Sequence, residues 1–588
     1  MVDRINPNNL ELLPRLVTNT RVSAPAGATP LRTAMLRHNT ETTYVVPGDY
    51  PPMDDLRWFP GRKAPAQGSQ VVYLIDGPAT FETMVEAIET ATSSSHFIVL
   101  LGWSLDVYTP MTAPGATPVK TFLNIVEERA KLGVAVRVLL WDNTEMLSGV
   151  DENNKALPVG STPRRLNENA KAALEKLRID QKLDVYANLD DNTKGWVSGL
   201  VAGLAGKSGV HSYGAHHHKI LLVYGSDGLI GFCGGIDIDP NRIHMLHDVH
   251  TRVLGDAAEA LWKIAEQRWS SAEDNGNPPS PASISSLAPA TFAQPSSAPY
   301  LARVFQTVGN PDLTSSVNND LWPSLEEALG RATRFIYMED QYFWSLDLVD
   351  ALVKAAKTVR YIVIVLPQAL TGEQAYKRHA ALGELVKRGG KGIEEKIGVF
   401  QATKPGHEYV HAKLFVMDDE YAMVTTANAN NRGYFLDSEA AVAVVERAAQ
   451  STEGSRRGEW YAIEGNFARK MRIELWVEHL QLVSEEVFDG LAARVHWDAL
   501  PLDARVAPYD ALNLKKLQLI WSASEALDAW KRKNAEATAK GQPLPESTKP
   551  APAPAWNDAE DRKPWWEAPY DDWAPEPPTG DSVIDPKD

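Results

Sequence analysis

Short apolar runs alternate with longer amphipathic stretches along most of this chain, and the runs come in matching pairs. Residues 96–104 (HFIVLLGWS) in the first half resemble residues 334–345 (RFIYMEDQYFWS) in the second. Another apolar run follows in each half, at residues 136–142 (VRVLLWD) and 359–367 (VRYIVIVLP). Continuous apolar runs of this length, separated by helical stretches, predict buried strands that alternate with helices. We therefore expect an α/β fold with a central sheet.

The pairing continues beyond these runs. Each half next has a His-x-Lys triplet, an apolar run, a turn and a second apolar run. Each half then closes with a strand that begins near an acidic residue and leads into a long helix. The same order of features twice in one chain is an internal repeat. We expect the two units to pack against each other as a pseudo-dimer.

Two segments differ in composition from the repeat. Residues 271–299 are rich in Pro, Ser and Ala, which predicts a linker or a long surface excursion. The end of the chain is rich in Pro and acidic residues but also holds four tryptophans, so a mobile tail and a docked segment both remain open. The predicted divisions are an N-terminal extension at 1–68, a first domain at 69–270, the linker at 271–299, a second domain at 300–535 and the tail at 536–588.

Charge and cysteine content narrow the class of protein. The 588 residues carry a formal net charge of -17, which disfavours non-specific binding to nucleic acid, and we expect no nucleic-acid partner. The single cysteine, Cys233, excludes an intrachain disulfide and suits a reducing compartment or an exported protein that needs no disulfides. Residues 1–16 lack the apolar core of a signal peptide, and no run reaches the roughly 18 apolar residues of a membrane span. We expect a soluble protein that is cytoplasmic as synthesised.

The paired His-x-Lys triplets are the candidate chemistry. His217 and Lys219 form the first triplet, and His411 and Lys413 form the second. Alternation along a strand places His and Lys of one triplet on the same face. An imidazole beside a fixed cation suits a phosphodiester, because the lysine can hold a non-bridging oxygen while the imidazole attacks or protonates. One such triplet is weak evidence, but two in matching positions of a repeat are strong evidence.

The sequence around these triplets resembles the phospholipase D superfamily, whose motif is His-x-Lys-x4-Asp followed by a Gly/Ser-x-Asn turn, present twice. In the second copy Asp418 and Asn428 take the Asp and Asn positions, and Gly234-Gly235 forms the turn of the first copy. Residues 336–343 and 468–480 also resemble a strand and the terminal helix of that family. The resemblance extends from about residue 70 to 530. It implies two tandem phospholipase D-like α/β/α sandwich domains that share one active site.

The resemblance also implies a mechanism and partners for the two imidazoles. His217 is expected to attack phosphorus and form a phosphohistidine, while His411 acts as acid and base. By position after each motif, Asp248 is expected to orient His217 and Glu439 to orient His411. Asn428 and the two lysines would supply the transition-state charge, so no metal or cofactor is expected. Gly235, Asp418, Tyr342 and Trp196 are the expected substrate-binding residues.

Several positions of the first copy depart from the family pattern. Tyr224 stands at the Asp position, with Asp227 three residues later, and Asp237 stands at the Asn position, where its charge would repel phosphate. The apolar loop around Trp196 is either packed on the body or dips into a lipid surface. Tyr342 is either core or pocket wall.

Two groups of histidines offer an alternative, a metal site. The candidates are His216, His217 and His218, which are consecutive, and His244, His247 and His250, which are spaced by three. Consecutive residues on a strand point to opposite faces, and residues 248–253 are predicted to form a strand. Neither set is therefore expected to bind a metal.

The resemblance favours a phospholipase D that hydrolyses the distal phosphodiester of membrane phospholipids, which it would contact peripherally and transiently. A phosphatidyltransferase, such as a cardiolipin or phosphatidylserine synthase, and a superfamily nuclease are the alternatives. The layout also resembles phospholipase D-type antibacterial effectors of type VI secretion. That resemblance implies export without a signal peptide into a target cell, and an immunity protein as partner.

Overall fold

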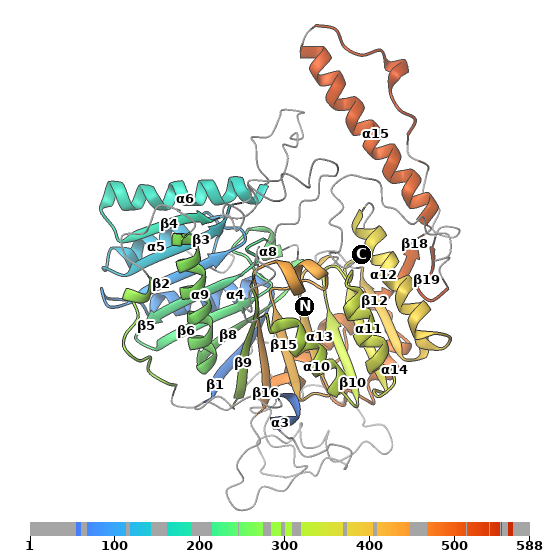
Figure 1. Cartoon of the computed structure of the whole chain (residues 1–588), viewed down its shortest axis with the longest axis horizontal. Coiled ribbons are helices and arrows are strands. Elements are labelled where there is room, and N and C mark those ends of the chain that lie inside the picture. The colour runs from blue at the N-terminus through green and yellow to red at the C-terminus, as the bar shows by residue number, and fades with distance from the viewer. Residues whose placement is uncertain are drawn as a thin grey trace, which may run out of the picture.

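The structure is a computed structural model that describes residues 55–567 apart from internal gaps (Figure 1). The ranges outside the described residues are 1–54, 60–67, 113–117, 143–161, 191–214, 245, 275–283, 296–299, 309–318, 369–372, 404–408, 447–466, 513, 540, 553, 555–561 and 568–588.

One fifteen-stranded mixed sheet runs through the molecule, and its strand order repeats. From the outer edge to the middle, the first half has the order β4-β3-β2-β5-β6-β8-β1, and the second has β12-β11-β10-β14-β15-β16-β9. The first seven strands are β4 (Val185–Asp190), β3 (Ala135–Trp141), β2 (Phe97–Gly102), β5 (Ile220–Gly225), β6 (Gly228–Gly234), β8 (Val249–Gly255) and β1 (Ser69–Ile75). The second seven are β12 (Ile397–Ala402), β11 (Tyr361–Leu366), β10 (Phe335–Glu339), β14 (Leu414–Met417), β15 (Tyr421–Thr425), β16 (Glu439–Glu446) and β9 (Tyr300–Thr307), and β17 (Val506–Pro508) is added beyond β12.

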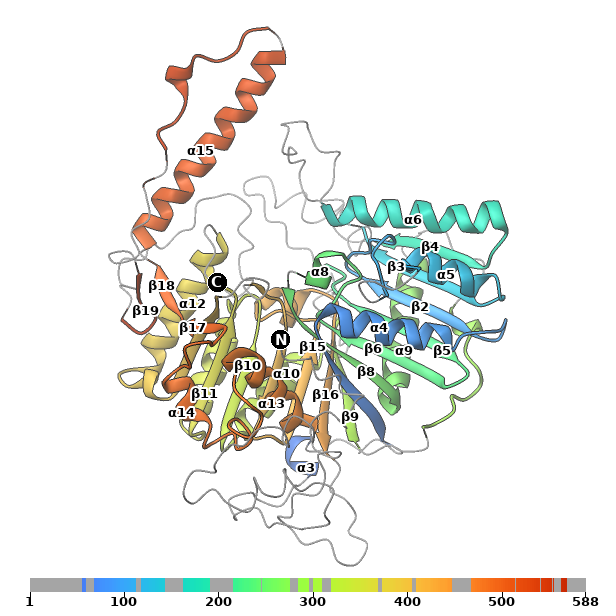
Figure 2. The same cartoon turned by 180° about the vertical axis from the view of Figure 1, so that it is seen from behind.

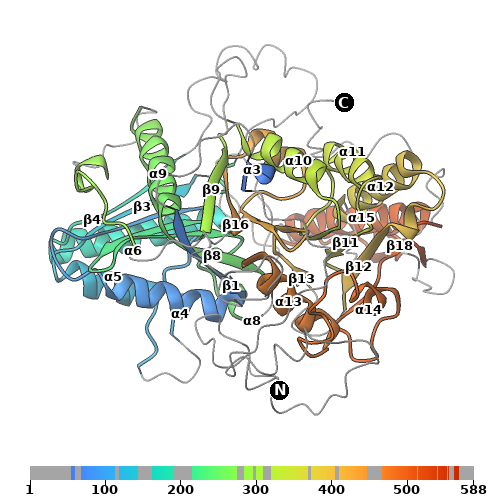
Figure 3. The ribbon, with the colours of Figure 1, turned by 90° about the horizontal axis from the view of Figure 1, so that it is seen from below.

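Helices cover both faces of each half of the sheet (Figure 3). In the first half α4 (Asp76–Glu89), α5 (Phe122–Ala130) and α6 (Thr162–Gln181) pack on one face, and α9 (Asp256–Asp274) packs on the other. In the second half α10 (Leu321–Arg331), α11 (Leu346–Ala355) and α12 (Glu373–Gly389) lie opposite α13 (Phe467–Leu480). Because both faces are covered, central strands such as β2 and β11 are buried at every position.

Local sequence accounts for several element boundaries. The side chain of Thr121 accepts a hydrogen bond from the backbone N–H of Asn124, and Asn124 reciprocates, which makes a capping box at the start of α5. Ser345 caps α11 by accepting from the N–H of Leu348 at 3.2 Å. These caps fix the points at which the chain leaves the sheet for a helix.

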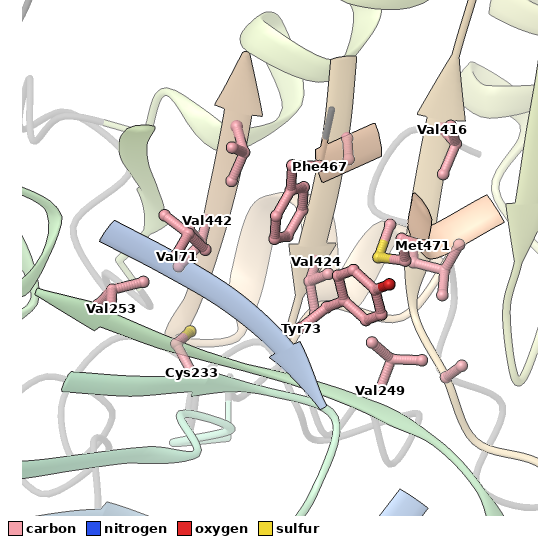
Figure 4. Close-up of a cluster of buried hydrophobic side chains, with 14 of the residues drawn as sticks. Val71, Tyr73, Cys233, Val249, Val253, Val416, Val424, Val442, Phe467 and Met471 are labelled. Atoms are coloured by element: carbon pink, nitrogen blue, oxygen red, sulfur yellow. The ribbon is translucent and has the colours of Figure 1, made fainter. Parts of the chain in front are cut away.

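The two halves share a continuous hydrophobic core at the middle of the sheet (Figure 4). Only Ser69 and Tyr300 pair between β1 and β9, so side chains carry most of the contact there. Tyr73 of β1 packs edge-on against Phe467 of α13, with ring centroids 5.4 Å apart, and Tyr300 packs against the same ring at 5.7 Å. Strands and helices from both halves thus meet in one core.

The predicted α/β fold with a central sheet is confirmed, and the predicted strands appear as β2, β3, β10 and β11. The domain boundaries stay predictions. Within the predicted linker, α9 continues to Asp274, and residues 284–295 pack on the body. Ile284 there is fully buried, and the ring of Phe292 lies 5.9 Å from that of Trp262.

The C-terminal region includes a long helix, α15 (Leu514–Ala539), that extends away from the sheet (Figures 1 and 2). The strand just before this helix, β18 (Asp510–Leu512), pairs with β19 (Arg562–Pro564) from beyond it, and the neighbouring Trp565 is only 1% exposed in the core of the second half. This part of the tail is therefore docked. No described helix is long and apolar enough to cross a membrane.

Candidate active site

The two His-x-Lys triplets lie at equivalent places, immediately before β5 and β14, and each is anchored to the opposite half. The N–H of His217 donates to the carbonyl of Ser438 at 3.0 Å, and the N–H of His411 donates to the carbonyl of His247 at 2.7 Å. The residues just before β8 and β16 are therefore held beside the imidazole of the other half. This backbone exchange brings the two triplets into one site.

Each imidazole is bonded to a carboxylate from the other half. His217 Nδ1 lies 2.9 and 3.1 Å from the two carboxylate oxygens of Glu439, and His411 Nδ1 lies 2.7 Å from Asp248 Oδ2. The expectation that Asp248 serves His217 and Glu439 serves His411 is wrong. The backbone exchange places the acid that opens each strand next to the opposite histidine. All four residues belong to one site, but the pairs are crossed.

Burial favours the neutral form of both imidazoles. Desolvation, followed by the charges of Lys219 and Lys413, holds the pKa of His217 well below its usual value. The pKa of His411 is also lowered well below its usual value, by burial and then by Arg242 and Lys413. With Nδ1 directed at a carboxylate, Nε2 is the nitrogen of each ring that is left for a substrate. A neutral imidazole can act as a nucleophile without first losing a proton.

The carboxylates are equally buried. Burial raises the pKa of Asp248 to about 7 and raises that of Glu439 well above its usual value, with Asp437 adding to the latter. Thr426 donates its hydroxyl to Glu439, which fixes that carboxylate. Gly235 lies against Asp248, since an added Cβ would be 1.9 Å from Asp248 Oδ1. The glycine predicted for substrate binding instead leaves room for the carboxylate.

Each lysine side chain lies close to the histidine of its own triplet. Lys413 Nζ donates to Gln341 Oε1 at 3.3 Å, and burial lowers its pKa to about 8. Lys219 Nζ lies 3.3 Å from Asp237 Oδ2 and 5.5 Å from the centre of the Trp103 ring. Asn428 is 8% exposed, and its side-chain oxygen accepts no hydrogen bond from the described residues. Within the described part of the chain this oxygen is thus open to a donor from a ligand.

Trp103 is a site residue that the sequence reasoning missed. Its ring lies 5.8 Å from that of His217, nearly perpendicular to it, as well as near Lys219. In the repeat Trp103 follows β2 as Gln341 follows β10, and each contacts the lysine of its own half. Aligning the two strands residue by residue would have found it.

Asp418 is not a substrate-binding residue, so that expectation is also wrong. It lies in the turn after β14, at the opposite end of the strand from His411, and is completely buried. Its carboxylate accepts from the backbone N–H groups of Thr333, Arg334 and Phe335 at 2.7–2.9 Å. It therefore fixes the start of β10.

The corresponding turn of the first half uses packing in place of a carboxylate. Tyr224 stacks on Phe97 at the start of β2, with centroids 5.3 Å apart. Asp227 lies in the turn between β5 and β6, is exposed and accepts from the hydroxyl of Ser226. It therefore does not take over the role that Asp418 has at the start of β10.

The other two substrate-binding predictions have different outcomes. Tyr342 packs on Trp344, with centroids 4.2 Å apart, and burial followed by neighbouring Tyr409 raises its pKa. Gln341, the residue before Tyr342, donates to the Tyr409 hydroxyl at 2.5 Å and accepts from Lys413, so Tyr342 is next in sequence to a residue of the site. Trp196 lies outside the described residues.

Among the candidate metal ligands, His216 and His217 have separate side-chain partners. His216 contacts Ser438 at 3.1 Å and Asp190 at 3.4 Å, whereas His217 contacts Glu439. Among the described residues, His247, Glu339 and His479 could bring ligand atoms within 4.8 Å of one another. Glu339 already contacts both imidazoles, at 2.9 and 3.0 Å, in a fully buried ion-pair network beneath His411.

Comparisons with known proteins agree with this geometry. The family described as "Cardiolipin synthase, PLD-like domain" matches residues 325–454, which include the second triplet. Phospholipase D alpha 4 of Arabidopsis thaliana is 22% identical over 68% of this chain and 63% of its own length. Phospholipase D alpha 1 of Cynara cardunculus is 22% identical over 69% of this chain and 64% of its own length. The chain thus spans less than two thirds of these curated relatives.

Among solved structures, phosphatidylserine synthase of Haemophilus influenzae is similar, with 13% identity over 65% of this chain and 84% of that one and a TM-score of 0.44. The repeated motif, the family match in the second half and the distant relatives over about two thirds of the chain carry the assignment. Together they support membership of the phospholipase D superfamily, to which the chain is similar over about two thirds of its length.

Proposed function

We propose that this chain is a phospholipase D, which hydrolyses the distal phosphodiester of a glycerophospholipid to phosphatidate and a free head group. The observation that supports it best is the crossed arrangement of two neutral imidazoles, each held by a buried carboxylate and accompanied by a lysine. Two imidazoles in one site allow one to bond phosphorus while the other transfers protons.

In the first step His217 Nε2 forms a bond to phosphorus as the bond to the head-group oxygen breaks. Substrate binding brings a negative charge beside His411, which favours its protonated form and offsets the nearby cations. His411 then gives its proton to the leaving oxygen. Lys219, Lys413 and Asn428 surround the charge that develops on the non-bridging oxygens.

In the second step water attacks phosphorus, and the phosphorus–nitrogen bond breaks. His411, now neutral, accepts a proton from the water. It returns a proton to solvent as phosphatidate leaves, which offsets the proton taken up on substrate binding and restores the neutral imidazole of the resting enzyme. An alcohol in place of water would give transfer through the same intermediate. The ratio of phosphatidate to transfer product, measured with and without added alcohol, distinguishes a hydrolase from a phosphatidyltransferase.

Head-group release from mixed phospholipid vesicles tests the proposal. We expect activity in the wild type and its loss in His217→Ala and His411→Ala, with His496→Ala on α14 (Arg494–Asp498) as a control that keeps activity. Failure to cleave any phospholipid, together with cleavage of DNA or of a generic diester, would refute the lipid substrate and favour the nuclease alternative.

Membrane phospholipids would be contacted peripherally through the apolar loop around Trp196, which remains a hypothesis from sequence. Replacing Trp196 and Leu200 with Ser should lower activity on vesicles more than on a soluble diester. Equal loss on both substrates would contradict it. Delivery as an antibacterial effector and an immunity protein stay hypotheses that the comparisons above do not support.

A further inference from the structure

The first half of the site has a carboxylate where the second half has an amide. Asp237 follows the Gly234-Gly235 turn as Asn428 follows the corresponding turn, and its side chain is 1% exposed. Its Oδ2 lies 3.3 Å from Lys219 Nζ and 3.5 Å from Arg242 Nη2. Asp237 therefore pairs with Lys219, a cation that phosphate would need, and also holds a second cation, Arg242, nearby.

Arg242 is the unexplained group of this arrangement. It lies on α8 (Asn241–His244), is 8% exposed, and its Nε has no hydrogen-bond partner among the described residues. The backbone at Arg242 is pressed against α4, since a Cβ on Gly77 would lie 2.1 Å from the Arg242 carbonyl oxygen. A buried guanidinium with an unused donor and a constrained backbone is suited to receiving an anion.

The charge of Arg242 acts on the reacting groups. After burial it is the largest cause of the lowered pKa of His411. It also lowers the pKa of Asp248, against the rise that burial causes. The fold agrees with this proximity, because the backbone of Arg242 lies against Gly77 and the adjacent Asp76 exchanges hydrogen bonds of 2.8 and 3.1 Å with Asp248.

Having Asp237 in place of an amide, together with Arg242, leaves the net charge that the site offers to phosphate unchanged. A site with an amide in each half would present the two lysine charges alone. Here Asp237 subtracts one charge and Arg242 restores it, so the two lysines, the arginine and the aspartate still sum to two positive charges. This compensation resolves the repulsion expected from Asp237.

We propose that Arg242 binds a non-bridging oxygen of the substrate phosphodiester in place of the missing amide, and that Asp237 is a positioning residue that holds Arg242 and Lys219. The inference rests on the proposed phosphodiesterase function. Arginine suits the role because its planar N–H groups can pair with two phosphate oxygens at once. A purely structural Arg242–Asp237 ion pair is the competing explanation.

Four proteins separate the two explanations: the wild type, Asp237→Asn, Arg242→Gln, and the double variant. Arg242→Gln leaves an uncompensated carboxylate beside the phosphate, so kcat/KM should fall roughly 10- to 150-fold, the range of one charge-assisted hydrogen bond. The double variant restores an amide and the original net charge, so it should be more active than Arg242→Gln. A double variant no better than Arg242→Gln would overturn the inference, as would wild-type activity in Arg242→Gln.

Calorimetric binding of inorganic phosphate gives a second readout that needs no turnover. Affinity should fall about tenfold or more in Arg242→Gln and recover in the double variant, while Arg494→Gln on α14 should bind as the wild type does. Unchanged phosphate affinity in Arg242→Gln would overturn the inference. If Arg242→Gln does not fold, Arg242→Lys replaces it: a weaker phosphate affinity supports paired contacts, and an unchanged one refutes them.

These outcomes separate failure of the inference from failure of the proposed function. Phosphate binding that depends on Arg242, in a protein that cleaves no diester, would refute the phosphodiesterase and leave the anion site standing. Diester cleavage and phosphate affinity that are both indifferent to Arg242 would refute the anion site alone.

Discussion

Replacing Glu439 with Gln keeps the shape of the group that holds His217, but removes the carboxylate that can pair with the ring when His217 gains positive charge on bonding phosphorus. The Glu439 carboxylate accepts from His217 Nδ1 at 2.9 Å and is completely buried, so water cannot substitute for the lost charge. A charge-assisted hydrogen bond contributes about 1.5–3 kcal/mol, and the amide oxygen retains the neutral part of it. We therefore expect kcat/KM to fall roughly 10- to 150-fold, since each 1.4 kcal/mol is about a factor of ten.

The crossed pairing makes this prediction specific to one reaction step. Glu439→Gln weakens the nucleophile His217 and should slow formation of the phosphohistidine on every substrate. Asp248→Asn weakens the acid His411, which a p-nitrophenyl diester does not need, because its leaving group departs without a proton. Rapid mixing with this diester should therefore show a normal burst in Asp248→Asn and a slow one in Glu439→Gln.

A control carboxylate lies at the other end of β14. Glu420 accepts from Arg57 and from the indole N–H of Trp58, at 3.0 and 3.1 Å, away from both histidines. Glu420→Gln should lower stability but leave the burst unchanged. A slow burst in Asp248→Asn with a normal one in Glu439→Gln would refute the combination of crossed pairing with His217 as the nucleophile.

Three further changes test other parts of the site. Gly235→Ala should cut kcat/KM about tenfold or more by displacing Asp248, whereas Gly330→Ala, which meets open space, should leave it unchanged; equal activity in both would contradict this. Asp418→Asn should lower the free energy of unfolding by about 3 kcal/mol with the kcat/KM of the folded protein unchanged, and a catalytic defect in thermally stable protein would restore Asp418 to the site. Because the pKa of Lys413 is lowered to about 8, its charge is lost as pH rises through that value, so kcat/KM for an anionic diester should decline above pH 8. Lys413→Arg should abolish this alkaline decline, and an identical decline in that variant would assign it to another group.

Much of the architecture was predictable because it rests on local periodicity. The apolar runs that form β2 and β11 are buried on both faces, so their sequences lack polar alternation and are recognisable as core strands. The repeat then implied matching positions for His217 and His411. Neither conclusion needed knowledge of how distant segments meet.

The crossed partners could not be predicted, since they depend on which half supplies the backbone beside each histidine. The bonds from His217 to Ser438 and from His411 to His247 are tertiary contacts with no local signal. Asp418 is different: a strand rises about 3.3 Å per residue, which places it roughly 16 Å along the chain from Lys413. That arithmetic alone argued against a shared site.

The role of Arg242 also lay beyond sequence patterns. Asp237 was recognised as a departure from the family, but its compensation depends on a short helix that returns a cation to the same oxygen. Whether the charges of a site balance can be seen only once the side chains around it are known.

Identification of the covalent intermediate tests the central claim most directly. The wild type, His217→Ala and His411→Ala would be mixed with a short-chain phosphatidyl p-nitrophenyl diester, quenched in alkali within milliseconds, digested and analysed by mass spectrometry. We predict a phosphatidyl adduct on His217 that accumulates in His411→Ala and is absent from His217→Ala. An adduct on His411, or turnover in His217→Ala at the wild-type rate, would contradict the shared site as described.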